Sequence, residues 1–419
     1  MNANKFALLV PKLRFPKYRK AGHWDRKKLH ELLFESKQRN RELKYGRKDV
    51  LSVSGEYGCV NQIEFMGRSY AGASLKDYHV VETGDIVYTK SPLKKSPFGI
   101  IKENKGNSGI VSTLYAVYRT TEIAHPSFLD HYFSRNYNLN SYLQPIVKKG
   151  AKNDMKVNNS DVLSGEIYAP IIEEQQKIAD CLGSLDDLIA AEGRKLEALR
   201  RYKQGLMQQI FPQPGETVPS LRFPEFRDNG AWEEGKAGSL FMNRRDRGEE
   251  GLPIYSVTMH DGMVRRDSLN RDYYDIEEAA GNKTARKNDI VYNMMRMWQG
   301  AIGVAPEDCL VSPAYIVLIP QNHVVSKFFE YMFKLSSSMD ILTSYSRGLT
   351  KDRLRLYYDD FARIPLYYPK NPEEQQRVAS CLSSLDTMLS AQMQTLDVLR
   401  QHKQGLLQQL FPSLEEDDS

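Results

Sequence analysis

The stretch that decides the fold is EEQQKIADCLGSLDDLIAAEGRKLEALRRYKQGLMQQIFP at residues 173–212, because it returns at residues 373–412 as EEQQRVASCLSSLDTMLSAQMQTLDVLRQHKQGLLQQLFP. The two copies are identical at 22 of 40 positions. A second pair, VPKLRFPKYRKAGHW at 10–24 and VPSLRFPEFRDNGAW at 218–232, is identical at 9 of 15. Between these segments the likeness is faint, and it is clearest where DIVY occurs at 85–88 and at 289–292. The pattern indicates a tandem duplication whose ends stayed alike while its middles diverged.

Each copy of the long segment predicts one long helix. Glutamates fall in the first turn, where they favour the helix dipole, and Pro212 and Pro412 end the pattern. The apolar positions recur three and four apart, at Ile178, Leu182, Leu185, Ile189, Leu196, Leu199, Leu206 and Ile210, and at Val378, Leu382, Leu385, Leu389, Leu396, Leu399, Leu406 and Leu410. About 38 residues make a helix of about 57 Å, which outruns one domain and favours a partner of equal length. We expect the other copy to be that partner, in antiparallel pairing; two separate helices, each packed on its own domain, remain the alternative.

The diverged middles predict two globular domains. Strand-like runs alternate there with short helical stretches, which is typical of α+β structure. The predicted fold class is α+β, with two globular domains separated by a pair of long antiparallel coiled-coil helices and related by pseudo-two-fold symmetry. Polar residues at matched seam positions, Glu192 with Gln392 and Lys203 with Lys403, should fix the register. The predicted boundaries are 1–165 for the first domain, 166–212 for the first helix, 213–231 for a linker, 232–365 for the second domain, 366–412 for the second helix and 413–419 for an acidic tail.

Composition narrows the class of protein. The 419 residues hold 58 basic against 53 acidic side chains, a net charge of +5 that by itself says nothing about nucleic acid. No apolar run approaches the roughly 18 residues of a membrane span, and the N-terminus lacks the features of a secretion signal. The four cysteines are far apart without a CxxC pair, which indicates reduced thiols and a cytoplasmic protein.

Basic residues concentrate in the loops of the two middles, and two of the runs follow directly after the DIVY segments. The candidate DNA-contacting residues are Lys90, Ser91, Lys94, Lys95, Lys148, Lys149 and Lys152 in the first middle, and Arg244, Arg245, Arg265, Arg296, Trp298, Gln299, Arg347 and Lys351 in the second. Arg and Gln side chains can read guanine and adenine edges, and Lys neutralises phosphate. For any single run taken alone, a solvated face is the more common explanation, and Trp24 and Trp232 are expected in the core.

Catalytic patterns are missing from the sequence. There is no HExxH, no Cys/His cluster for zinc, no P-loop and no Asp/Asn-Pro-Pro-aromatic tetrapeptide of an amino-methyltransferase. Asp85 followed by Glu103-Asn104-Lys105 has a nuclease-like spacing, but such triplets are expected by chance in a chain this charged. We therefore expect a non-catalytic reader with no metal and no cofactor of its own.

Two variable globules alternating with two near-identical helices, opened by EEQQ and closed by KQGLMQQIFP or KQGLLQQLFP, resemble the DNA specificity subunit of a type I restriction-modification system. The resemblance covers essentially the whole chain. It implies that each globule is a target recognition domain for one half of a bipartite, asymmetric DNA site. The helix pair would then set the length of the unread spacer between the halves, in keeping with a fixed separation of half-sites.

The resemblance also implies partners in the cytoplasm. Two modification subunits would bring S-adenosylmethionine and methylate adenine N6, and restriction subunits would add ATP- and Mg-dependent translocation and cleavage. Two identical partners need two identical binding surfaces. The candidate residues for these surfaces are Lys203, Gln204, Gln208 and Gln209, and Lys403, Gln404, Gln408 and Gln409. A coiled-coil adaptor without DNA reading and a fused enzyme are the alternatives.

Overall fold

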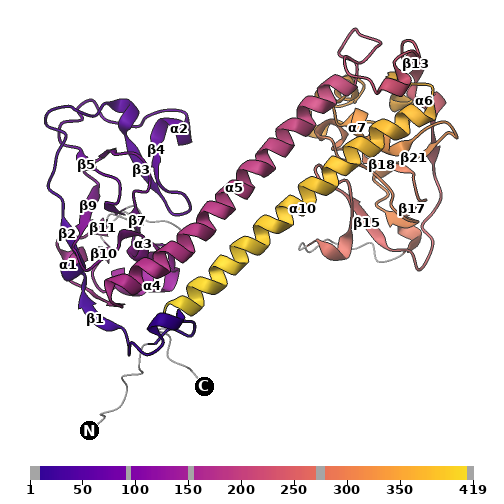
Figure 1. Ribbon diagram of the computed structural model, residues 1–419. Coiled ribbons are helices and arrows are strands. Elements are labelled where there is room, and N and C mark those ends of the chain that lie inside the picture. The colour runs from indigo at the N-terminus through magenta and orange to yellow at the C-terminus, as the bar shows by residue number, and fades with distance from the viewer. Residues whose placement is uncertain (1–9, 91–95, 150–154, 270–278, 413–419) are drawn as a thin grey trace. The chain divides into compact units, whose positions relative to one another are not determined.

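The structure, a computed structural model, describes residues 10–90, 96–149, 155–269 and 279–412. It contains two long helices, α5 (Ile172–Ile210) and α10 (Pro372–Leu410), of 39 residues each (Figure 1). The chain divides into two compact units, residues 1–193 with 395–419 and residues 194–394. Each unit therefore joins one diverged middle to the start of its own long helix and to the end of the other copy's helix.

The first unit is built around a four-stranded antiparallel sheet in the order β2-β9-β6-β7. Its strands are β2 (Leu33–Glu35), β9 (Tyr115–Thr120), β6 (Ile86–Thr89) and β7 (Ile100–Glu103). Smaller pairings are β1 (Asp25–Lys28) with β12 (Glu166–Ala169), β3 (Leu51–Ser54) with β4 (Gly58–Asn61), β5 (His79–Val81) with β8 (Gly109–Val111), and β10 (Lys148–Lys149) with β11 (Met155–Lys156). Helices are α1 (Leu29–Leu32), α2 (Gln62–Met66), α3 (Pro126–Ser134) and α4 (Asn136–Leu143).

The second unit repeats this plan. Its main sheet has the order β14-β21-β18-β19, with β14 (Phe241–Arg244), β21 (Tyr315–Pro320), β18 (Ile290–Asn293) and β19 (Ile302–Val304). A second sheet holds β16 (Met263–Arg265), β15 (Ile254–Val257), β20 (Cys309–Val311) and β17 (Lys283–Ala285), and β13 (Glu233–Lys236) pairs with β22 (Pro365–Tyr368). Helices are α6 (Ala237–Leu240), α7 (Ser326–Phe333), α8 (Ser336–Ser344) and α9 (Tyr358–Phe361). Both DIVY segments thus form a central strand, β6 or β18, of matched sheets.

The long helices pair antiparallel within each unit. In the first unit, Ile178 and Leu182 near the start of α5 share a core with Leu410 and Phe411 at the end of α10. One step further along α5, Asp186 forms an ion pair with Lys403. Because the residue numbers of the contacts fall along α10 as they rise along α5, the two helices run in opposite directions. The predicted antiparallel partner is therefore confirmed.

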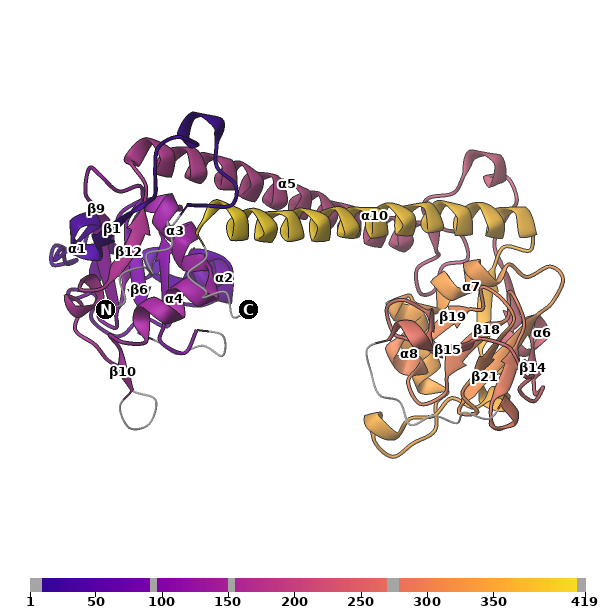
Figure 2. The same cartoon turned by 90° about the horizontal axis from the view of Figure 1, so that it is seen from below.

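The second unit contains the same contacts with the repeats exchanged. Ile210 and Phe211 at the end of α5 share a core with Val378 and Leu382 of α10. Lys203 forms an ion pair with Asp386. Helix α7 lies between this part of α10 and the main sheet (Figure 2), and its buried residues belong to the same core. The contacts are thus pseudo-symmetric, as the duplication predicts.

Aromatic side chains explain why both copies end in Phe-Pro. Phe411 is fully buried in the first unit, with its ring centroid 5.8 Å from that of Trp24 and 5.4 Å from that of Phe128. In the second unit Phe211 lies 6.1 Å from Trp232 and 5.3 Å from Phe328. The expectation that both tryptophans are core residues is confirmed. Each helix therefore ends in a hydrophobic anchor.

The other repeated motifs form two buried polar clamps. Arg14 of the first LRFP segment donates two hydrogen bonds of 2.7 Å to the Glu174 carboxylate, and Arg222 of the second donates two of 2.8 Å to Glu374. The residue after each glutamate, Gln175 or Gln375, bonds to backbone groups of two other segments. Its side chain donates to a carbonyl just before the long helix, and it bonds to a carbonyl and an N–H just before α3 or α7. Because a buried charge must be paired, LRFP and EEQQ depend on each other although they lie about 160 residues apart.

Candidate nucleic-acid interface

The loop after β18 presents three of the predicted contact residues. The chain leaves Asn293 and makes a short 3₁₀ turn at Met297–Gln299, which is held in place by the fully buried Met297 side chain. Arg296 and Gln299 on this turn are exposed. Trp298 is half-buried, and its indole N–H donates to the Met295 carbonyl at 3.1 Å. The turn therefore displays an arginine and a glutamine on a fixed support.

A second loop lies against the first. The backbone groups of Arg347 and Arg355 exchange two hydrogen bonds of 2.9 Å, which closes a narrow hairpin. The next residue, the buried Leu356, donates its backbone N–H to the Met294 carbonyl of the first loop at 2.9 Å. Arg347, Arg353 and Arg355 are exposed on this hairpin. Two loops far apart in sequence thus form one basic surface.

This basic surface, defined as Arg296, Gln299, Arg347, Arg353 and Arg355, is partly neutralised by the fold. The Arg347 guanidinium donates to Asp360 at 2.5 Å, and this hydrogen bond raises the pKa of the arginine. Arg355 was not among the candidate residues from the sequence. The sequence RGLTKDRLR at 347–355 could have indicated Arg355, because a hairpin turn that begins at Gly348 places arginines on both of its arms.

The remaining candidates of the second unit lie elsewhere. Arg244 on β14 donates to Asp289 at 2.6 Å and to Asp246 at 2.8 Å, so much of its hydrogen-bonding capacity is used inside the unit. Arg245 beside it is exposed. Arg265 at the end of β16 is exposed and pairs with Asp267 at 3.0 Å. Lys351 is in a 3₁₀ turn of the hairpin. The DNA contacts of all these residues stay a prediction.

In the first unit the same two positions carry lysines. Lys90 is half-buried directly after β6. The loop it opens returns at Gly99, whose φ of +100° and 2.1 Å approach of an added Cβ to the Thr89 carbonyl oxygen require glycine. Lys148 and Lys149 form β10, which pairs with β11 as the counterpart of the 347–355 hairpin. Ser91, Lys94, Lys95 and Lys152 lie outside the described residues.

The predicted partner-subunit residues divide into two groups. Lys203 and Lys403 pair with Asp386 and Asp186 inside the chain. The glutamines are all exposed on the last two turns of α5 and α10: Gln204, Gln208, Gln209, Gln404, Gln408 and Gln409. The repeated lysines thus have an internal role in the helix pair, and the exposed glutamines offer matched surfaces.

Asp85, the first residue of the nuclease-like spacing, has a structural role. Asp85 accepts a hydrogen bond from the Glu82 N–H at 2.8 Å and lies 3.3 Å from Arg119. Its counterpart Asp289 accepts from the Arg286 N–H at 2.8 Å and pairs with Arg244. Since both repeats use this aspartate to hold the turn before the central strand, its position needs no catalytic explanation. Among the described residues, no group of three or more His, Cys, Asp or Glu side chains is arranged to hold a metal ion.

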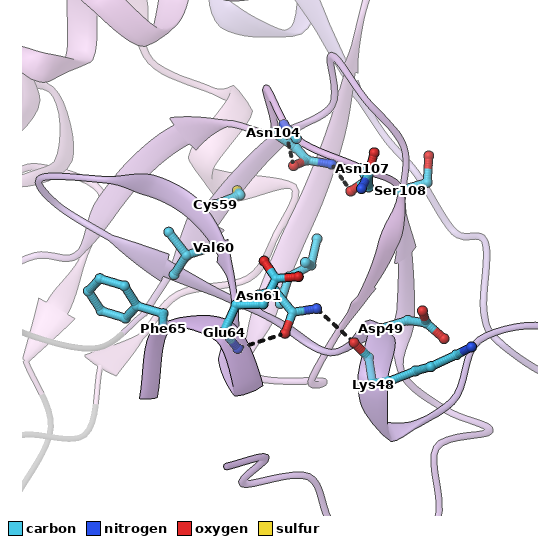
Figure 3. A pocket seen from close by; sticks show the side chains of 12 residues that line it. Lys48, Asp49, Cys59, Val60, Asn61, Glu64, Phe65, Asn104, Asn107 and Ser108 are labelled. Atoms are coloured by element: carbon cyan, nitrogen blue, oxygen red, sulfur yellow. Dashed lines mark hydrogen bonds between the residues drawn. The ribbon is translucent and has the colours of Figure 1, made fainter. Parts of the chain in front are cut away.

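A pocket of about 660 Å³ lies in the first unit, between the β3–β4 hairpin with α2 and the 104–108 loop (Figure 3). Its polar side chains mainly build local turns. Asn61 accepts from the backbone N–H groups of Ile63 and Glu64 to cap α2, and Asn104 bonds to Gly106 and Asn107. Burial raises the pKa of the Cys59 thiol to about 12, which keeps it protonated and unreactive.

The comparisons with known proteins agree with this arrangement. A family model described as the type I restriction modification DNA specificity domain matches residues 24–201 and again residues 234–400. The chain belongs to this family. Each match runs from the start of a diverged middle into the long helix that follows it, so the chain of this family member carries two such domains.

Two curated relatives come from Methanocaldococcus jannaschii. The type I restriction enzyme MjaIX specificity subunit is 26% identical over 116 residues, which are 28% of this chain and 26% of the relative. The putative type I restriction enzyme MjaX specificity subunit is 30% identical over 296 residues, which are 67% of this chain and 66% of the relative. The chain thus matches about a quarter and about two thirds of the length of these two relatives.

A solved structure has the same fold. The crystal structure of a type I restriction-modification system S subunit from M. genitalium is 15% identical, with a TM-score of 0.58 over 97% of this chain and 100% of that chain. In the part of the chain that the structure describes, no helix is both long and apolar enough to cross a membrane.

Proposed function

We propose that this chain is the DNA-reading subunit of a type I restriction-modification complex in which each target recognition domain reads one half of a bipartite, asymmetric site. The observation that carries the proposal is the repetition of two basic segments. In each repeat one segment follows the matched central strand, β6 or β18, and the other follows the matched short helices, α3 and α4 or α7 and α8. Two such sets of basic segments on one chain suit two different half-sites.

In this proposal the length of the α5–α10 helix pair sets the length of the unread DNA between the half-sites. Each end of α5 and α10 is anchored in a buried core and fixed in register by a lysine–aspartate pair. A continuous helix of 39 residues rises about 1.5 Å per residue, so inserting or deleting residues changes its length by a set amount. The unread spacer between the half-sites would follow that length.

Catalysis belongs to partner subunits in this proposal, and this chain is not itself an enzyme. Two modification subunits dock through the matched glutamine surfaces of α5 and α10 and carry S-adenosylmethionine for adenine N6 methylation. Restriction subunits carry ATP and Mg for translocation and cleavage. The assembly acts in the cytoplasm, where it defends against phage DNA.

A genome-wide map of N6-methyladenine, in the source organism with the gene intact and deleted, tests the proposal. One gapped motif should lose methylation on deletion, which gives both half-sites and the spacer. If no motif changes, the chain is an adaptor or its modification partner is silent, and co-purification of a methyltransferase with the tagged chain separates these two outcomes.

Two variants then test the basic surface. Arg296→Glu with Gln299→Glu should abolish methylation of the motif, because it replaces a base-reading pair by acids that repel phosphate. Arg227→Glu with Asn229→Glu is the matched control, since it makes the same change in charge at two exposed positions of the same unit outside these loops. Equal methylation in both variants would remove the 294–300 loop from the DNA interface.

A further inference from the structure

Leu349 is the least covered large apolar side chain among the described residues. It is 98% exposed, whereas the next most exposed, Leu114, is 68% exposed. A leucine in this position gains nothing from burial in the folded chain, so its apolar surface is free for a ligand. Single exposed leucines are common on surfaces, and its setting decides what it can do.

Backbone hydrogen bonds and close packing support Leu349. It stands at the tip of the hairpin closed by Arg347 and Arg355, and the Arg353 N–H donates to the Thr350 carbonyl at 2.9 Å to complete the turn. The preceding Gly348 is required, because an added Cβ would lie 2.6 Å from the Arg353 carbonyl oxygen. The base of the hairpin is fixed by the buried Leu356. The side chain is therefore held out on a preorganised tip.

Arginines lie on both sides of this tip. Arg347, Arg353 and Arg355 are exposed on the same hairpin together with the exposed Asp352, and Arg347 is engaged by Asp360. Met295 of the neighbouring loop lies across a pocket of about 500 Å³ from Leu349 and is itself 39% exposed. An apolar tip flanked by arginines matches the chemistry of DNA, in which stacked bases lie between two rows of phosphates.

We propose that Leu349 inserts between neighbouring base pairs in the half-site read by the second unit and partly unstacks them, while the flanking arginines hold the phosphates. This inference rests on the proposed DNA-reading function and names a contact within it. Apolar wedges on arginine-rich supports kink DNA in this way. The sequence preference would come from how easily a base step unstacks, because a leucine makes no hydrogen bond to a base.

The inference distinguishes the two half-sites. In the first repeat the equivalent glycine, Gly150, is followed by Ala151, which lacks the bulk of a wedge. Unstacking should therefore occur in the half-site of the second unit, and the half-site of the first unit should stay stacked.

The test uses the full chain, with any methyltransferase that co-purifies, and duplexes of the gapped motif carrying 2-aminopurine at successive steps. With the unaltered chain, fluorescence should rise at one step of one half-site. Leu349→Ala should abolish the rise and weaken binding about tenfold, and Leu349→Met should restore both. Met242→Ala, at an exposed methionine of the same unit on β14, is the control and should change neither.

Three results would overturn the inference. Unchanged affinity and an unchanged fluorescence profile in Leu349→Ala would remove the wedge but leave the proposed function intact. Loss of the co-purifying methyltransferase in Leu349→Ala, with DNA binding unaltered, would make the tip a protein contact. Failure of the unaltered chain to bind the gapped motif would overturn the proposed function and the wedge together. Thermal unfolding of the variant should match that of the unaltered chain, because the side chain is exposed.

Discussion

Phe411→Ala tests whether the last helix turn of the second repeat is a structural part of the first unit. The Phe411 ring is fully buried and lies 5.4 to 6.0 Å, centroid to centroid, from those of Trp24, Phe128 and Tyr132. Truncating a buried Phe to Ala costs about 3–5 kcal/mol through lost transfer energy and the cavity left behind. The substitution should therefore destabilise residues nearly 400 positions away in the sequence.

Hydrogen exchange with mass spectrometry measures this locally. If exchange in the β1 and α3 peptides proceeds through opening of the first unit, its rate should rise roughly 100- to 4,000-fold, which is 3–5 kcal/mol at 1.4 kcal/mol per factor of ten. Gln404→Ala, at an exposed position on the same helix, is the control. A rise of less than tenfold in the first-unit peptides would refute the reasoning, since α10 would then not be an integral part of that core.

Three further predictions concern the clamp, the register and pH. Glu174→Ala leaves Arg14 buried without its partner and should destabilise the first unit by about 3–5 kcal/mol in chemical denaturation; an effect below 1 kcal/mol would show that the clamp is dispensable. Insertion of seven residues in α5 should change or destroy the recognised spacer, read from the methylated motif, and an unaltered spacer would show that the helix pair is not the ruler. Burial lowers the pKa of His131 to about 4, so this side chain is neutral when folded but binds a proton below about pH 6.5 when unfolded. The contribution of His131 to the stability of the first unit should therefore be fully present above about pH 6.5 and be lost as the pH drops toward 4. Tyr331 holds the matching position of α7, since Asp130-His131 of α3 corresponds to Glu330-Tyr331. His131→Tyr should therefore reduce this acid sensitivity, and an identical pH profile would contradict the assignment.

Local patterns made much of the fold predictable. The apolar spacing of α5 and α10 is a property of each helix by itself, and the second copy named the partner. The DIVY segments were likewise recognisable as matched strands, because apolar runs after a turn indicate buried strands wherever they occur. The position of the loops that follow β6 and β18 was predictable from this match alone.

The makeup of the interface was less predictable. Composition makes Arg296 and Arg347 candidates, but the adjoining of their loops is seen only in the folded chain, in the hydrogen bond between Leu356 and Met294 and in the pocket that Met295 shares with Leu349. Arg244 had the same appearance in the sequence, yet it is engaged by Asp289 on the neighbouring turn. Ion pairs of this kind depend on which strands become neighbours, and that information is not local.

The sequence by itself determined the duplication and the two long helices, because repetition and helical periodicity are written in consecutive residues. It predicted their antiparallel pairing but left separate helices open, and the contacts between α5 and α10 decided between the two. Only the tertiary structure decided which contacts the repeated residues make. Lys203 and Lys403, expected both to fix the helix register and to lie at a partner interface, pair with Asp386 and Asp186 inside the chain. Phe211 and Phe411 anchor each helix end in a core that contains the start of the other copy's helix. The two ion pairs join residues 183 and 217 positions apart, and burial and charge pairing at that range exist only once the chain has folded.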